Sequence, residues 1–342
     1  LKCGAAYAPV LRFRPYSWAQ RDQANDEACS SKGFCTVMGI LFALTVLAAS
    51  AVTPHDGRPL DHVPALWAGL IPGPYRVGYR RLDTAGGVVH AWYPTSAGGS
   101  RLRFRDYLGN DAHRVESFLA QAGVHPATTD SLFRSLLYAV RSPRPLERAF
   151  PLVLIAQGNG QDVADQVVLC EYLASWGFVV AATPSPMLHT PLEREDQVGA
   201  LADTQASELA AAITAVSMVL RVDSQHLGVV GHSFGARAAL LLAMRDPRIR
   251  AIVSLDGGIG TATAVEPFRR APSFRSDAPL PPLLHVYEEL DAFMTPDFAL
   301  LRSLHAAELI LDPTEGMHHA HFTTYGLAAA VFPEFAAVTH AT

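Results

Sequence analysis

The fold is decided by one stretch of the chain, which reads LGVVGHSFGARAALLLAM over residues 227–244. The apolar run 227–230 is typical of a buried strand, and residues 236–244 have the composition of a helix. Between them stands the pentapeptide GHSFG. A serine on such a sharp strand-to-helix turn is held in a strained conformation, with its hydroxyl above the sheet and the next amide aimed at a developing oxyanion. The sequence therefore predicts that Ser233 is a nucleophile.

The flanking sequence alternates between strand and helix patterns. Two runs, 75–82 and 88–93, are separated by a turn at Gly86-Gly87 and predict an antiparallel start. Amphipathic helices are expected over residues 163–174 and 206–220. Short, mainly apolar runs suit strands covered on both faces, and they lie at 152–156, 178–182, 227–230, 251–255, 283–287 and 308–311. This alternation predicts an α/β fold with a doubly wound, mostly parallel sheet.

Residues 111–149 are expected to form a small helical insertion. Apolar side chains recur through it at helical spacing: Phe118, Leu119, Leu132, Phe133, Leu136 and Leu137. The Pro-rich stretch 142–145 ends the pattern. We interpret this insertion as a flap over a pocket.

Composition bounds the class of protein. The chain has 342 residues, of which 49% are apolar and 17% charged, with a formal net charge of -5. It can bury a large core, and it offers no basic surface for a nucleic-acid backbone. Three of its four cysteines precede residue 36, which leaves Cys170 alone and excludes a disulfide framework in the main domain.

The N-terminal part contains an export pattern. Residues 33–54 carry no charge, follow Lys32 and include the small residues 49–51. Residues 32–53 therefore predict a signal peptide or, uncleaved, a membrane anchor through 33–53. The domain 54–342 is then exported, either secreted, periplasmic or anchored facing outward. We assign no function to the tail 1–31.

A serine nucleophile needs a base, and the base needs an orienting carboxylate. Two acids follow predicted strands, Asp256 and Asp291, and position alone does not choose between them. The base is expected among His318, His319 and His321. A zinc site is the rival interpretation, but adjacent histidines without a Cys or carboxylate partner at a recognised spacing disfavour it. We expect neither a metal nor an organic cofactor.

A glycine-containing loop follows the first central strand and reads Gln157-Gly158-Asn159-Gly160. Glycines allow backbone amides to approach a substrate carbonyl, so this loop is the candidate for the second half of an oxyanion hole. A turn without catalytic meaning has the same appearance.

From Gly73 to Phe332 the chain resembles the platelet-activating factor acetylhydrolases and their dienelactone-hydrolase-like relatives, within the α/β-hydrolase superfamily. The shared features are GPY at 73–75, WYP at 92–94, LASWGFVVA at 173–181, GHSFGA at 231–236, LDG at 255–257 and a His three residues before Phe322. The resemblance implies Asp256 as the acid, His319 as the base, and the amides of Asn159 and Phe234 as the oxyanion hole. Gln157 stands where the family often has His, a difference that bears on the substrate.

The resemblance implies a serine esterase that hydrolyses small-molecule or lipid esters through an acyl-enzyme, with short acyl groups preferred. A lipase or polyester hydrolase with longer acyl substrates is the first alternative. The second is a binding protein that keeps the fold without turnover. The sequence does not predict an oligomeric state.

Overall fold

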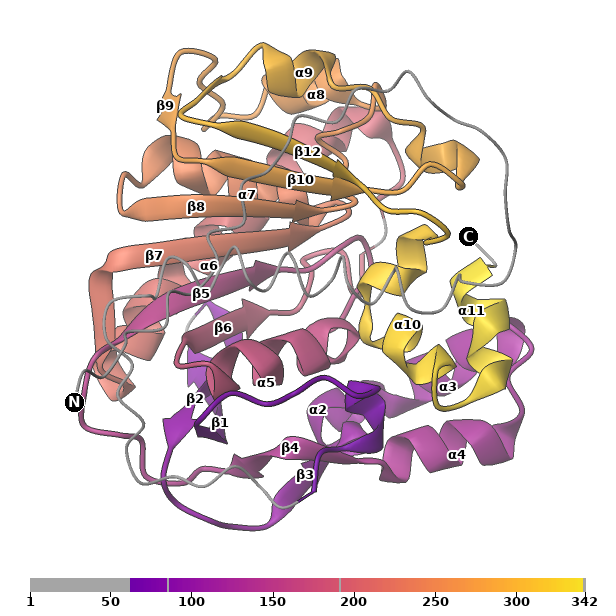
Figure 1. Ribbon diagram of the computed structural model, residues 1–342. Coiled ribbons are helices and arrows are strands. Elements are labelled where there is room, and N and C mark those ends of the chain that lie inside the picture. Colours follow the sequence, from indigo (N-terminus) through magenta and orange to yellow (C-terminus); the bar gives the residue numbers. More distant parts are fainter. Residues whose placement is uncertain (1–61, 85, 191, 341–342) are drawn as a thin grey trace, which may run out of the picture.

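The computed structural model describes residues 62–84, 86–190 and 192–340 (Figure 1). The expected export segment 32–53 and the tail 1–31 lie outside the described residues. Within the described ranges, no helix has both the length and the apolar character needed to cross a bilayer.

Among the described residues, ten strands form one sheet in the spatial order β12-β10-β8-β7-β5-β6-β2-β1-β4-β3, and β9 pairs with β11 in a second, small sheet. The strands are β1 Arg76–Thr84, β2 Gly87–Thr95, β3 Arg101–Arg103, β4 Leu136–Arg141, β5 Phe150–Ala156, β6 Val179–Thr183, β7 Val222–His232, β8 Ile249–Leu255, β9 Pro279–Leu280, β10 Leu283–Tyr287, β11 His305–Ala306 and β12 Leu309–Pro313. The strands from β6 to β12 along this order are parallel, whereas β1 and β2 pair antiparallel. The predicted mostly parallel sheet with an antiparallel start is confirmed.

Helices cover both faces of the sheet. The α-helices are α2 Phe104–Leu108, α3 Ala112–Gln121, α4 Pro126–Arg134, α5 Val167–Ser175, α6 Val198–Val219, α7 Gly235–Arg245, α8 Val265–Arg269, α9 Ala299–Arg302, α10 Thr324–Ala329 and α11 Ala336–His340. The 3-10 helices are η1 Ala65–Trp67, η2 Gly109–Asp111, η3 Val163–Gln166, η4 Glu195–Gln197, η5 Ala292–Met294, η6 His319–Phe322 and η7 Pro333–Phe335.

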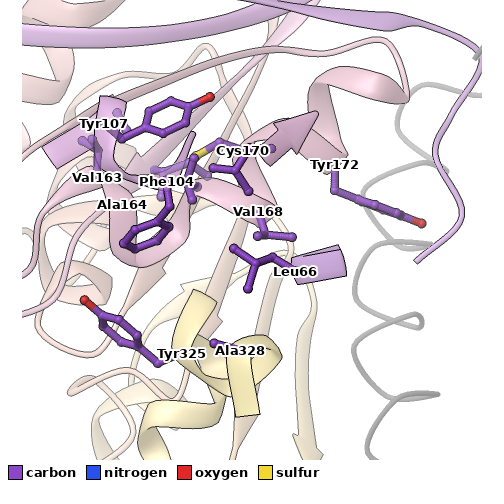
Figure 2. Packing of buried hydrophobic residues seen from close by; sticks show 14 of the residues in the cluster. Leu66, Phe104, Tyr107, Val163, Ala164, Val168, Cys170, Tyr172, Tyr325 and Ala328 are labelled. Atoms are coloured by element: carbon purple, nitrogen blue, oxygen red, sulfur yellow. The ribbon is translucent and has the colours of Figure 1, made fainter. Parts of the chain in front are cut away.

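The central strand β5 shows how the two faces are built. Val153 and Ile155 pack into the core beneath α5 and α10, and the alternate residues Leu152 and Leu154 pack into the core beneath α6 and α7. Successive side chains of a strand point to opposite faces, so a strand buried on both faces must be apolar throughout. Figure 2 shows part of the core beneath α5 and α10, to which α2, η3 and α10 all contribute side chains.

The insertion differs from its prediction at one end. Residues 112–121 and 126–134 are helical as expected, but Leu136 and Leu137, predicted as helical, lie in strand β4, which pairs parallel with β1. A short apolar run fits either a strand or a helix turn by periodicity alone. The following Tyr138 and Val140 are residues that favour a pleated, buried surface. Pairing with β1 on one side and β3 on the other therefore makes this run a strand.

The buried carboxylate of Glu171 connects helix α5 to three other elements. Glu171 of α5 has no exposed surface, and its two oxygens accept hydrogen bonds from four donors. These are Trp67 Nε1 at 3.2 Å, Tyr107 Oη at 2.9 Å, and the amides of Tyr138 at 2.7 Å and Ala139 at 2.9 Å. Burial raises the pKa of Glu171, the four donors opposing that rise. One side chain thus joins η1, α2 and β4 to α5.

Candidate active site

Ser233 lies on the turn from β7 to α7, as the sequence predicts. Its φ is +53°, in the left-handed region that costs a non-glycine residue roughly 1–2 kcal/mol. Its amide donates to the Leu255 carbonyl at 3.1 Å, which fixes the turn against the end of β8. A Cβ on Gly235 would come within 2.1 Å of the Ala156 carbonyl oxygen, so only glycine fits at this position. The strain at Ser233 is therefore maintained by tight packing on both sides.

Asp256 follows β8 directly and contacts a histidine ring. Its side chain is almost fully buried, and Oδ2 lies 2.5 Å from Nδ1 of His319 in η6. Its own amide donates to the Val286 carbonyl at 2.7 Å, and its φ is +42°. Oδ1 accepts the Glu288 amide at 3.3 Å. Asp256 is thus held by two neighbouring strand ends with one oxygen facing the His319 ring.

Asp291, the alternative acid, has a different set of partners. Its Oδ1 lies 2.6 Å from Nδ1 of His318, and its Oδ2 accepts the backbone amide of His319 at 2.7 Å. The amide of Asp291 in turn donates to Glu288 Oε2 at 2.9 Å. Asp291 therefore binds the backbone next to the His319 ring, and it fixes the histidine loop.

The three histidines of this loop have separate partners. The His319 ring faces Asp256, the His318 ring faces Asp291, and Nδ1 of His321 accepts the His318 amide at 2.9 Å. No group of three or more His, Cys, Asp or Glu side chains that could hold a metal is found among residues 62–84, 86–190 and 192–340. Each of the three rings therefore contacts a different group.

His232 is not among the predicted site residues, but its ring packs against the His319 ring with 4.7 Å between the ring centroids. Its Nδ1 lies 3.0 Å from Oε1 of Gln161. The same Gln161 atom accepts the Gly158 amide at 2.6 Å, which identifies it as the amide oxygen. Because an amide oxygen can only accept, Nδ1 of His232 must donate. Burial and the neighbouring His319 ring hold the pKa of His232 well below its usual range, so His232 is neutral. Its place inside the pentapeptide was the only sequence signal.

The loop after β5 approaches the serine closely. A Cβ on Gly158 would lie 3.0 Å from the Ser233 Cβ and 2.6 Å from Gln161 Oε1. The Gln157 carbonyl accepts Nε2 of Gln205 in α6 at 2.8 Å. Asn159, the next residue, lines the same cavity as Ser233. Phe234 is buried directly after the serine. The two residues predicted to supply oxyanion amides thus flank the turn, Asn159 on the loop and Phe234 immediately before α7.

A cavity of about 320 Å³ joins these groups. Ser233, His319 and Asn159 line it, together with Arg114 and Phe118 of α3. Its volume lies at the lower end of the range for small-molecule sites. Helix α3 of the insertion therefore contributes to the wall of the cavity.

Comparisons with known proteins agree with this fold. Residues 143–261 match the PETase family model, described as PET hydrolase-like. Over 104 residues the chain is 33% identical to cutinase 2 of Thermobifida cellulosilytica, a match covering 30% of this chain and 38% of that protein. The chain thus spans about two fifths of the length of that curated relative.

The solved structure of a ferulic acid esterase from Streptomyces cinnamoneus superposes with a TM-score of 0.56 at 21% identity, covering 81% of each chain. At that identity the likeness concerns the fold. The resemblance to platelet-activating factor acetylhydrolases stays a prediction, because these matches carry other descriptions. The family model, the curated relative and the structural neighbour agree on one assignment: the chain has the α/β-hydrolase fold.

Proposed function

We propose that this chain is a serine esterase that hydrolyses carboxylic esters through an acyl-enzyme. The observation that carries the proposal is the cavity where Ser233, on its strained turn, and His319, paired with Asp256, both line the wall. The strand-turn-helix context and the order Ser, Asp, His are those of the superfamily's triad. The names of the relatives, a cutinase and a ferulic acid esterase, support ester chemistry.

In the proposed reaction, Nδ1–H of His319 donates to Asp256, which leaves Nε2 free to accept the Ser233 proton. Ser233 Oγ attacks the ester carbonyl carbon, and the amides of Asn159 and Phe234 stabilise the oxyanion. The protonated His319 then protonates the leaving alcohol, and water repeats the cycle to release the acid. Each oxyanion donor is worth about 2.7–4 kcal/mol of transition-state stabilisation in such enzymes.

Two substrate classes follow from different observations. The modest cavity favours small acyl groups, in line with the acetylhydrolase resemblance. A polyester or long-chain ester is favoured by exposed aromatic rings around the site, Phe118 at 46% and Phe293 at 50% exposure. The Phe293 ring meets the His319 ring edge to face at 5.2 Å, so this apolar surface reaches the reacting groups. The PET hydrolase-like match supports the same class.

The test is hydrolysis of p-nitrophenyl esters from acetate to palmitate, alongside release of acid from a polyester suspension, by the wild type and Ser233→Ala. We expect ester hydrolysis that is lost in Ser233→Ala. A peak at short chains supports the acetylhydrolase-like substrate, and release from the suspension supports the polyester. A wild type indistinguishable from buffer on every substrate contradicts the proposal and favours a binding protein without turnover.

We also infer that the domain is exported. The uncharged stretch 33–54 after Lys32 is the supporting observation. Sequencing the N-terminus of the protein recovered from culture medium, periplasm and membrane fractions tests it, and recovery from the cytosol alone contradicts it.

A further inference from the structure

We propose that Arg114 binds a free carboxylate on the substrate, so that the preferred esters are monoesters of dicarboxylic acids. The inference rests on the proposed esterase function and specifies the substrate of the same site. It stands on the position of Arg114 in the cavity wall and on guanidinium nitrogens that lack partners.

Arg114 faces the same cavity as the reacting groups. It comes from α3 of the insertion and lines the cavity of about 320 Å³ together with Ser233 and His319. Its Nη1 donates to the Gly160 carbonyl at 3.1 Å, one residue beyond Asn159. The guanidinium is therefore attached to the loop that carries a proposed oxyanion amide.

Two nitrogens of this guanidinium are unsatisfied. Nε and Nη2 of Arg114 are both buried, and neither has a hydrogen-bond partner among the residues that the structure describes. A buried donor without a partner costs about 1–3 kcal/mol, and more when it is charged. The guanidinium presents its N–H groups as a planar fork that fits the two oxygens of a carboxylate. In this arrangement neither nitrogen is open to a water-sized group, so the Arg114 side chain must turn toward the cavity for a substrate carboxylate to reach them, and the carboxylate would then satisfy both nitrogens at once.

The neighbouring acids do not fill this role. Asp162 and Asp165 lie close enough to Arg114 for their charges to interact with it. However, both carboxylates bind backbone amides at the start of η3. Oδ1 of Asp162 accepts the Ala164 amide at 3.1 Å, and Oδ2 of Asp165 accepts the Asp162 amide at 2.9 Å. Burial raises their pKa values to about 6 and about 7. Near neutral pH Asp165 therefore competes for the guanidinium with less than its full negative charge.

The size of the cavity limits the distance between the Arg114 guanidinium and Ser233. A site of this volume takes a small acid, so the carboxylate must stand at the far end of a short acyl chain or ring. A neutral ester of the same length would leave Nε and Nη2 unpaired. Selectivity for the anion over the neutral ester is the expected consequence.

The experiment compares mono-p-nitrophenyl adipate, which has a free carboxylate, with p-nitrophenyl methyl adipate, which is neutral and of similar size. The readout is the ratio of their kcat/KM values for the wild type, Arg114→Gln and Arg114→Lys. We expect the wild type to prefer the anion about 10- to 100-fold, the gain of one or two charge-assisted hydrogen bonds. Arg114→Gln should bring the ratio close to one, mainly through KM, and Arg114→Lys should give an intermediate ratio.

The ratio cancels any disturbance of the loop that affects both esters equally. Arg194→Gln, an exposed arginine paired with Asp196 outside the cavity, is the matched control and should keep the wild-type ratio. If the wild type shows no preference for the anionic ester, the inference is wrong, and this result does not depend on whether a variant folds. Equal losses on both esters in Arg114→Gln also overturn it. Turnover of the neutral ester without selectivity leaves the esterase proposal standing. If neither ester is hydrolysed and a fluorophosphonate probe does not label Ser233, the proposed function itself is wrong.

Discussion

Replacing Asp256 by Asn separates the two candidate acids most sharply. The carboxylate oxygen lies 2.5 Å from Nδ1 of His319, and Asn keeps its size while removing the charge. An amide nitrogen facing Nδ1 favours the tautomer with the proton on Nε2, which cannot accept from Ser233. In triad enzymes this change lowers kcat about 10⁴-fold. We expect a loss of about 10³- to 10⁴-fold here, with KM nearly unchanged because Asp256 does not line the cavity.

Asp291→Asn is the matched comparison. Asp291 reaches the His319 backbone amide at 2.7 Å and the His318 ring at 2.6 Å, so it acts on the reacting ring only by positioning it. Losing the charge of such a hydrogen bond costs about 1–2 kcal/mol, and we expect kcat to fall about 10-fold. The assay is kcat and KM for p-nitrophenyl acetate, with thermal unfolding as the check on folding. A larger loss in Asp291→Asn than in Asp256→Asn refutes the assignment of Asp256.

Three further outcomes are expected. Gly235→Ala places a Cβ 2.1 Å from the Ala156 carbonyl oxygen and should lower the free energy of unfolding in urea by about 1–3 kcal/mol, whereas an unchanged midpoint contradicts the packing at the turn. Glu171→Ala leaves four buried donors without an acceptor and should cost at least about 3 kcal/mol by the same measurement; a loss under 1 kcal/mol contradicts its anchoring role. Burial raises the pKa of Asp165 from 3.8 to about 7 in the folded chain. Between these two pH values the folded state keeps a proton that the unfolded state has released. The free energy of unfolding therefore falls as the pH rises from about 4 to about 7. Asp165→Asn should remove up to about 4 kcal/mol of this fall between pH 4 and pH 8, and an unchanged pH dependence speaks against the shifted carboxyl.

Much of the fold was predictable because it depends on local rules. The buried parts of the central strands are short and mainly apolar, since burial on both faces leaves little room for polar side chains. The observed bounds fall close to the predicted runs except at β7, which begins at Val222 instead of residue 227. The turn at Ser233 was equally recognisable, because its geometry requires glycine at a fixed spacing. Strand β4 was mistaken for helix, since its choice depends on pairing with β1 rather than on its own periodicity.

The site was predictable in its residue types more than in its pairings. Asp256 and Asp291 each follow a parallel strand, so both reach the same edge of the sheet, and spacing alone left them equivalent. The structure distinguishes them by which atoms of the histidine loop they contact. Arg114 gave no sequence signal, because its place in the cavity wall depends on how α3 packs against loops far along the chain.

The assignment of Ser233 as the nucleophile can be tested with a fluorophosphonate probe and mass spectrometry of the intact protein and its peptides. We expect a single adduct on the peptide containing Ser233, absent from Ser233→Ala and formed more slowly in Asp256→Asn. Labelling that persists in Ser233→Ala, or that falls on another residue of the wild type, would contradict it.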